Sequence, residues 1–122
     1  MPYRIGKYTL KMEHSPSIES YASVGSKKES EGPLAAYFDL LEPDGYFGEK
    51  TWEKAESRIQ REAINRALAK GNLDPSDIDY VFAGDLLNQC ISSSFGLREL
   101  GIPLFGLYGA CSTMAESLSL AG

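Results

Sequence analysis

Two short apolar stretches, each followed by a glycine-containing turn, decide the fold of this chain. The first is Ile78-Asp-Tyr-Val-Phe-Ala83 followed by Gly84-Asp85, and the second is Pro103-Leu-Phe-Gly-Leu-Tyr108 followed by Gly109-Ala-Cys-Ser-Thr113. Short, β-rich apolar runs are typical of strands buried on both faces of a parallel sheet. We therefore predict two neighbouring parallel strands, each leading into a helix from its carboxyl end.

Helical patterns surround these strands. Thr51 to Lys70 carries an apolar stripe at helical spacing, with Thr51 as N-cap and Gly71 as the C′ residue. Residues 89–100 are also predicted to be helical, and a last helix is predicted to start at about Cys111. The order helix, strand, helix, strand, helix over residues 49–122 predicts an α/β fold, with a mostly parallel sheet flanked by helices.

The first 48 residues have a different composition. Residues 3–12 alternate loosely between apolar and polar side chains, which predicts one strand. Residues 13–48 are rich in Ser, Pro, Gly and charged residues, which predicts a long loop with a short helical interlude at Leu34 to Leu41. We treat residues 1–122 as one partial domain, and expect it to be the N-terminal piece of a larger protein because the last helix is still under way at Gly122.

Composition and charge exclude several functions. The chain has 122 residues, with 12 Lys and Arg against 17 Asp and Glu, for a net charge of −5. That balance argues against a nucleic-acid binder, which needs a basic face. No run of about 18 apolar residues predicts a membrane span, and the N-terminus lacks the apolar core of a secretory signal. Two cysteines cannot form a disulfide framework, so we expect a reducing compartment.

Cys111 is the strongest candidate for chemistry. A cysteine where a strand turns into a helix meets the N–H groups and dipole that favour a thiolate; the alternative is a small buried packing residue. Cys90, within the preceding predicted helix, is interpreted as packing. His14 is the single histidine and lies far away in sequence, so the chain offers no convincing Cys–His pair. No His and Cys spacing indicates a metal site, and we predict no cofactor.

Asp85 and Asn88 follow the first predicted strand. Their oxygen atoms could hydrogen-bond a ligand or coordinate calcium. A helix cap and a turn amide explain the same two residues equally well. The residues alone leave both interpretations open.

Several segments, in order across almost the whole chain, resemble the stage V sporulation protein AD family. Those that carry the resemblance are Ala83-Gly-Asp-Leu-Leu-Asn-Gln89, Phe105-Gly-Leu-Tyr-Gly-Ala-Cys-Ser-Thr113, Lys28-Glu-Ser-Glu-Gly-Pro-Leu34 with Phe38-Asp39, Trp52-Glu-Lys-Ala-Glu56, and Leu73 to Asp79. The family belongs to the thiolase-like superfamily, and this chain resembles its opening portion, well under half. The resemblance implies an incomplete N-terminal half of a thiolase-like fold.

The resemblance also implies a function. The family is a binding protein that takes part in loading dipicolinic acid, as its calcium chelate, into the spores of endospore-forming bacteria. Cys111 matches the acyl-accepting nucleophile of the superfamily, and with Asp85 and Asn88 it would line the ligand pocket. The resemblance implies membrane-embedded partners of the same sporulation group, a homodimer of the full-length protein, and cytoplasmic synthesis. It also implies a soluble protein, or one held peripherally at the forespore or spore inner membrane.

Two further functions remain open. The chain could belong to a thiolase or ketoacyl-synthase type acyltransferase with Cys111 as nucleophile, which requires a histidine from a C-terminal half. It could also be a structural or assembly piece without a ligand site. Phe105 and Tyr108 could stack on a pyridine ring, although for Phe105 strand packing is preferred.

Overall fold

The computed structural model describes residues 2–122, except for the side chain of Asn88. The strands of the described chain are β1 (Tyr3–Ile5), β2 (Thr9–Lys11), β3 (Val24–Gly25), β4 (Leu40–Leu41), β5 (Val81–Gly84) and β6 (Leu104–Leu107). Its α-helices are α1 (Lys27–Ser30), α2 (Trp52–Gly71), α3 (Ile91–Leu97) and α4 (Thr113–Ala121). Short 3-10 turns η1 to η5 lie at Ala35–Tyr37, Pro75–Asp77, Asn88–Cys90, Arg98–Leu100 and Ala110–Ser112.

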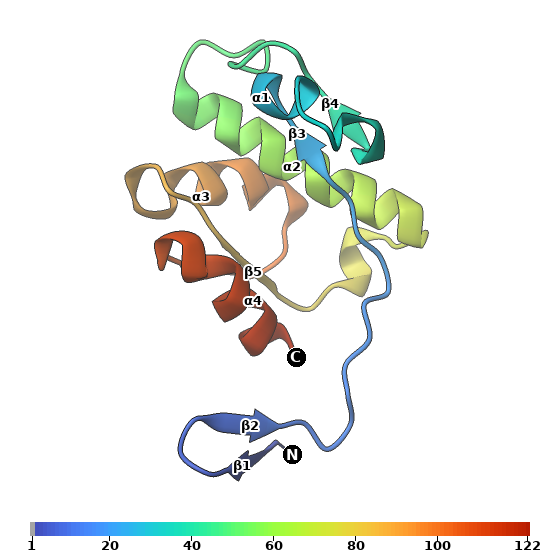
Figure 1. Ribbon diagram of the computed structural model, residues 1–122, viewed down its shortest axis with the longest axis vertical. Coiled ribbons are helices and arrows are strands. Elements are labelled where there is room, and N and C mark those ends of the chain that lie inside the picture. The colour runs from blue at the N-terminus through green and yellow to red at the C-terminus, as the bar shows by residue number, and fades with distance from the viewer. Residues whose placement is uncertain (1) are drawn as a thin grey trace.

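Strands β5 and β6 pair in parallel, as the two apolar stretches predicted. Helix α3 lies in the connection between them, and α4 packs against β5 (Figure 1). The prediction of burial on both faces was wrong for β6, because Phe105 stacks on Phe82 and is still 50% exposed. One face of this small sheet therefore carries aromatic side chains that the described helices do not cover.

The sheet architecture differs from the single, mostly parallel sheet that the sequence predicted. The described strands form three two-stranded sheets, of which β3–β4 and β5–β6 are parallel and β1–β2 is antiparallel. The single strand predicted for residues 3–12 was wrong because Gly6 adopts a positive φ of 64° and reverses the chain into a hairpin. Strands β3 and β4 lie inside the predicted 13–48 loop. The result is a mixed α/β fold with short parallel sheets flanked by helices.

Helix α2 is the long central element and starts where predicted. The Thr51 side chain accepts a hydrogen bond from Lys54 N at 3.3 Å, which caps the first turn. At the other end the prediction was one residue early, since Gly71 is still helical and Asn72 takes the left-handed cap position at φ 52°. Asparagine tolerates this conformation better than most side chains do.

Helices α2 and α3 approach each other closely. A Cβ atom at Gly96 would lie 2.7 Å from the backbone oxygen of Ser57, so glycine is required at this crossing. The Ser57 hydroxyl donates to the backbone oxygen of Ser92 at 2.7 Å. This contact fixes α3, and with it the turn after β5, on the central helix.

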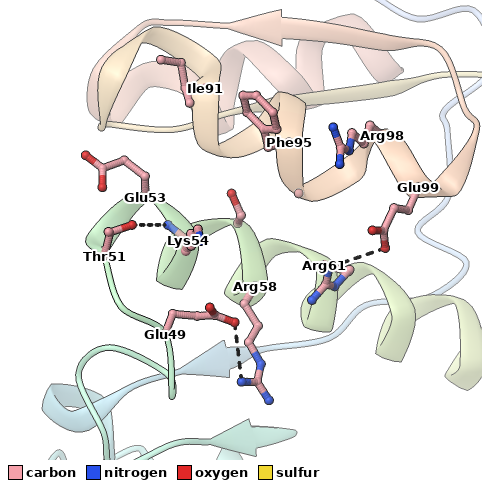
Figure 2. Close-up of a pocket in the computed structure, with 12 residues that line it drawn as sticks. Glu49, Thr51, Glu53, Lys54, Arg58, Arg61, Ile91, Phe95, Arg98 and Glu99 are labelled. Atoms are coloured by element: carbon pink, nitrogen blue, oxygen red, sulfur yellow. Dashed lines mark hydrogen bonds and ion pairs between the residues drawn. The ribbon is translucent and has the colours of Figure 1, made fainter.

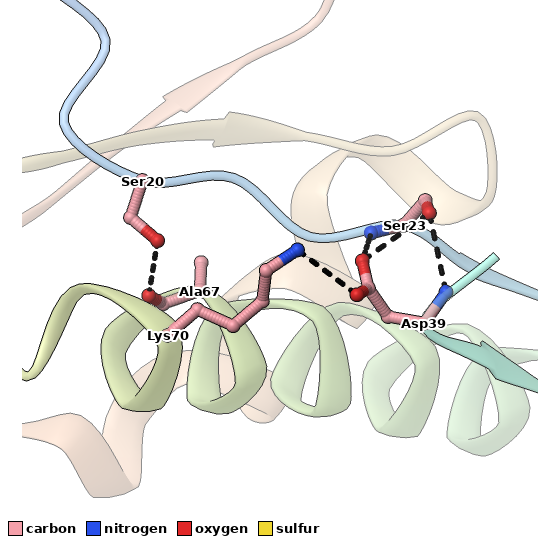
Figure 3. A network of polar contacts seen from close by, with 5 residues as sticks. All are labelled: Ser20, Ser23, Asp39, Ala67 and Lys70. Carbon is pink, nitrogen blue, oxygen red and sulfur yellow. Dashed lines mark hydrogen bonds and ion pairs between the residues drawn. The ribbon is translucent and has the colours of Figure 1, made fainter. Parts of the chain in front are cut away.

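The long N-terminal segment is fastened to α2 by polar contacts (Figure 3). Ser20 Oγ donates to Ala67 O at 2.6 Å. The Asp39 carboxylate accepts Ser23 N at 2.8 Å and pairs with Lys70 Nζ at 2.9 Å. The Ser23 N–H and the Lys70 ammonium hold the pKa of Asp39 below its ordinary value. Residues 20–41 are therefore an ordered layer over α2.

Candidate functional site

The carboxyl ends of β5 and β6 lie side by side. Gly84 pairs with Leu107 in the parallel register. A Cβ atom at Gly84 would lie 2.0 Å from Leu107 O and 2.7 Å from Thr113 Cγ2. The turn after β5 and the start of α4 are thus in direct contact, so the predicted site segments do share one edge of the sheet.

Asp85 lies in the first of these turns and is 5% exposed. Its carboxylate accepts hydrogen bonds from Cys90 N at 3.0 Å, Ser93 N at 2.9 Å and Ser93 Oγ at 2.8 Å. These bonds satisfy N–H groups at the start of α3, which no intrahelical acceptor reaches. The geometry favours the helix-cap interpretation of Asp85, and its contact with a ligand stays a prediction.

Cys90 was predicted to lie within a helix, but it ends the short 3-10 turn η3 and immediately precedes α3. It adopts a left-handed conformation with φ 70°. Its thiol donates to Leu107 O at 3.2 Å, which ties the first turn to strand β6. Burial, with a smaller effect of the Asp85 charge, raises the pKa of the Cys90 thiol. A half-buried, hydrogen-bonded thiol of raised pKa fits the predicted packing role.

Cys111 lies in the second turn and is exposed. It belongs to the 3-10 turn before α4, so the predicted helix start at about this residue is confirmed. Ser112 Oγ donates to Gly109 O at 2.5 Å, and Gly109 N donates to Thr113 Oγ1 at 3.1 Å. The exposure contradicts the alternative that Cys111 is a buried packing residue, and leaves its thiol open to a ligand.

The backbone just before Cys111 is strained. Ala110 has a positive φ of 51°, a conformation that costs an L-residue with a Cβ atom roughly 1–2 kcal/mol. Strain of this kind persists only where surrounding contacts enforce it. The two hydrogen bonds between Gly109 and the start of α4 supply that enforcement.

Asn88, His14 and Ser93 are the other residues that bear on the predicted site. The side chain of Asn88 lies outside the described residues, so its role stays a prediction. His14 is exposed in the extended N-terminal segment. Ser93, the principal partner of Asp85, was not predicted from the sequence. The Ser92-Ser93-Ser94 run at the start of an otherwise apolar helix was the available signal.

A half-buried carboxylate lies behind the first turn. Burial is the main cause that raises the pKa of Glu56, and the negative charge of Asp85 raises it further. The fully buried Ser92 hydroxyl interacts with the Glu56 carboxylate and opposes part of this rise in pKa. The first turn is therefore packed against a polar interior, whereas the second turn faces solvent.

Two cavities lie elsewhere in the fold. One of about 420 Å³ lies between α2 and α3, where Arg61 pairs with Glu99 at 3.5 Å and Arg58 with Glu49 at 3.8 Å (Figure 2). The other, of about 540 Å³, has a mainly apolar lining from α2, β5, α4 and residues 17–20. Neither cavity is lined by Cys111 or Asp85.

The described residues carry neither a metal cluster nor a membrane span. Among them, no group of three or more His, Cys, Asp or Glu side chains is arranged to hold a metal ion. No helix of the described chain has the length and apolar character needed to cross a bilayer. The exposed Cys111 thiol lies just before the first turn of α4.

Comparison with known proteins identifies the family. The family model described as Stage V sporulation protein AD (SpoVAD) matches residues 6–122. The chain is 40% identical over 116 residues to stage V sporulation protein AD of Bacillus subtilis (strain 168), covering 95% of this chain and 34% of that protein. The chain thus spans about a third of the length of this curated relative. The extent of the family match shows that the chain belongs to the stage V sporulation protein AD family.

Proposed function

We propose that this chain is the N-terminal part of a sporulation protein that binds dipicolinic acid as its calcium chelate. The observation that supports this most is the family match over residues 6–122, which includes both turns at the shared sheet edge. We further propose a thiolase-like fold, a homodimer of the full-length protein, and a place at the forespore or spore inner membrane beside membrane-embedded partners. The finer parts of this proposal come from the family resemblance.

The second turn offers contacts that suit this ligand. N–H groups at the start of a helix donate hydrogen bonds to carboxylates, and dipicolinate carries two carboxylates. Tyr108, 57% exposed and three residues before Cys111, has an aromatic face that a pyridine ring could stack on. A net charge of −5 repels the free dianion at long range but has little effect on a chelate whose charge is largely neutralised.

The acyltransferase alternative is not favoured. The family match names a sporulation protein rather than an acyltransferase. A thiol nucleophile also needs a base within hydrogen-bond reach. The exposed Cys111 accordingly serves in our proposal as a pocket residue, with Asp85 positioning the neighbouring turn.

Isothermal titration calorimetry tests the proposal, with the protein expressed at the full length of its gene. Calcium dipicolinate is titrated in parallel with calcium chloride alone and with sodium dipicolinate alone. We expect saturable heat with the chelate, and a loss of affinity of at least about tenfold in Cys111→Trp, because a bulky ring would block the pocket. Cys90→Ser, which changes the sheltered thiol, is the matched control and should bind as the parent does.

Two results would count against the proposal. An absence of heat with all three titrants would show that the protein does not bind dipicolinate. Equal affinity of the parent and Cys111→Trp would show that Cys111 does not line the binding pocket. Covalent labelling of Cys111 by an acyl thioester, detected by mass spectrometry, would instead support the acyltransferase.

A further inference from the structure

Charge is distributed unevenly along the chain. Residues 2–12 contain the three basic residues Arg4, Lys7 and Lys11 and no acidic residue. Residues 13–122 contain 9 basic and 17 acidic residues, a net charge of −8. The β1–β2 hairpin is thus a basic element joined to an acidic body.

The hairpin stands apart from that body (Figure 1). An extended segment connects it to β3, and all six of its strand residues are exposed. The exposed side chains include Tyr8 at 86%, Leu10 at 67% and Tyr3 at 50%. A two-stranded hairpin alone in water is only marginally stable, so a contact surface would stabilise this one.

Cations and aromatic rings lie beside each other on the hairpin. Lys7 Nζ is 5.1 Å from the centre of the Tyr8 ring, and Lys11 Nζ is 6.0 Å from that of Tyr3. The Arg4 guanidinium donates to the backbone oxygen of Lys7 at the turn. The cationic groups therefore lie beside the aromatic rings.

Each face of the hairpin mixes charge with apolar surface. The register pairs Tyr3 with Lys11 and Arg4 with Leu10 across the two strands. Because directly paired residues point to the same face of a sheet, each face presents a cation next to a large apolar or aromatic side chain. An apolar groove on a protein would have to bury a cation whichever face it received. A lipid headgroup layer accepts both kinds of side chain at one depth.

We propose that the β1–β2 hairpin docks edge-on on an anionic lipid surface, so that cations from both of its faces, Arg4, Lys7 and Lys11, reach the headgroups. Tyr8 and Leu10 then lie in the interfacial layer. Lysine and arginine are attracted to anionic lipids, and tyrosine is enriched at membrane interfaces. A specific protein interface buries about 800 Å² on each partner, more than a hairpin with three-residue strands is expected to supply alone.

The acidic body does not prevent this contact. Charges farther than about 8 Å from a surface are largely screened at physiological ionic strength. The protruding basic hairpin can therefore contact the lipid while the acidic body stays beyond the screening length. The inference deepens the proposed place at a spore membrane by naming the segment that contacts lipid. It does not depend on the proposed ligand binding, because lipid binding and calorimetry are measured separately.

Vesicle co-sedimentation tests the inference on the full-length gene product. The probes are phosphatidylglycerol–phosphatidylcholine vesicles and vesicles of phosphatidylcholine alone. Three surface cations are worth about 100-fold in partition coefficient together, so we expect a loss of that order in the triple variant Arg4→Gln, Lys7→Gln, Lys11→Gln. The matched control, Lys27→Gln, Lys28→Gln, Lys50→Gln, removes three exposed cations from the body and should change the partition coefficient less than about threefold.

Trypsin cleavage of the unchanged protein is a second test, which does not require the triple variant to fold. We expect cleavage after Arg4, Lys7 and Lys11 of the unchanged protein to slow at least about fivefold with anionic vesicles, and to stay the same with neutral ones. The inference is overturned by equal sedimentation with both vesicle types, or by an equal loss in the two triple variants. It is also overturned if these sites are protected without vesicles, because the hairpin then contacts protein.

Discussion

Two strand–turn–helix units meet at one edge of the β5–β6 sheet, and they differ in how the turn is held. In the first, the buried carboxylate of Asp85 binds Cys90 N and Ser93 and fixes the start of α3. In the second, two hydrogen bonds around Gly109 hold a strained turn and leave Cys111 exposed. Similar sequence signals can therefore lead to one closed turn and one open turn, and the difference lies in a single polar side chain.

The largest effect is expected where the two units touch. Gly84→Ala should lower the free energy of unfolding by more than about 3 kcal/mol, because its Cβ atom would overlap the backbone oxygen of Leu107. Gly106→Ala is the matched control in the adjacent strand, where the nearest atoms belong to the Cys90 side chain at 3.3 Å and can shift. Urea denaturation monitored by circular dichroism measures both. A loss in Gly106→Ala as large as in Gly84→Ala would contradict the close contact.

The closed turn should depend strongly on its carboxylate. Asp85→Ala removes the acceptor of three hydrogen bonds and leaves buried donors unsatisfied, so we expect a loss of about 3 kcal/mol in unfolding free energy. Asp79→Ala, at an exposed position, should change the stability by less than about 0.5 kcal/mol. The same denaturation measurement applies. If the two variants were equally stable, the capping role of Asp85 would have to be abandoned.

The two cysteines should differ in reactivity. Cys111 is exposed, whereas burial and the Asp85 charge raise the pKa of Cys90. Because the thiolate is the reactive form, iodoacetamide at pH 8 should label Cys111 at least about tenfold faster than Cys90. Peptide mass spectrometry resolves the two sites, and Cys111→Ser should abolish the fast phase. Faster labelling of Cys90 would show that the first turn opens.

The smallest effect concerns Glu56, behind the closed turn. Glu56 has a raised pKa, so its ionised form destabilises the folded state, and this cost disappears as pH falls below the ordinary value of 4.5. Glu56→Gln should therefore stabilise the protein at pH 7 by no more than about 1 kcal/mol, since solvent screens a half-exposed group. The gain should disappear at pH 4. A gain that persists there would mean that ionisation is not its cause.

Periodicity and capping chemistry predicted the elements around both turns. The apolar runs at Ile78 and Pro103 gave neighbouring parallel strands, and the Thr51 cap gave the start of α2. Each of these signals depends on a few residues that are close together in the sequence. The helix that was predicted over residues 89–100 is interrupted, because Gln89 and Cys90 adopt positive φ angles. In this conformation the Cys90 N–H donates to the Asp85 carboxylate.

The remaining features depend on contacts between distant residues. The β3–β4 pair needs residues 24 and 40 to meet, and Asp39 bonds to Ser23 and Lys70 help to hold them there. The hairpin at Gly6 was predicted as one strand, because the residues on both sides of Gly6 have high strand propensity. At the site, sequence marked Asp85 and Cys111 but could not tell a buried cap from an open thiol, since burial is decided by packing.

The hydrogen bond from the Cys90 thiol to Leu107 O also provides a built-in vibrational reporter. The S–H stretch absorbs in a part of the infrared spectrum where other protein groups do not. One thiol donates to a backbone carbonyl and the other is exposed, so the two should give separate bands that Cys90→Ser and Cys111→Ser assign. A ligand that contacts only the second turn would shift one band and leave the other in place, which locates its binding without any added label.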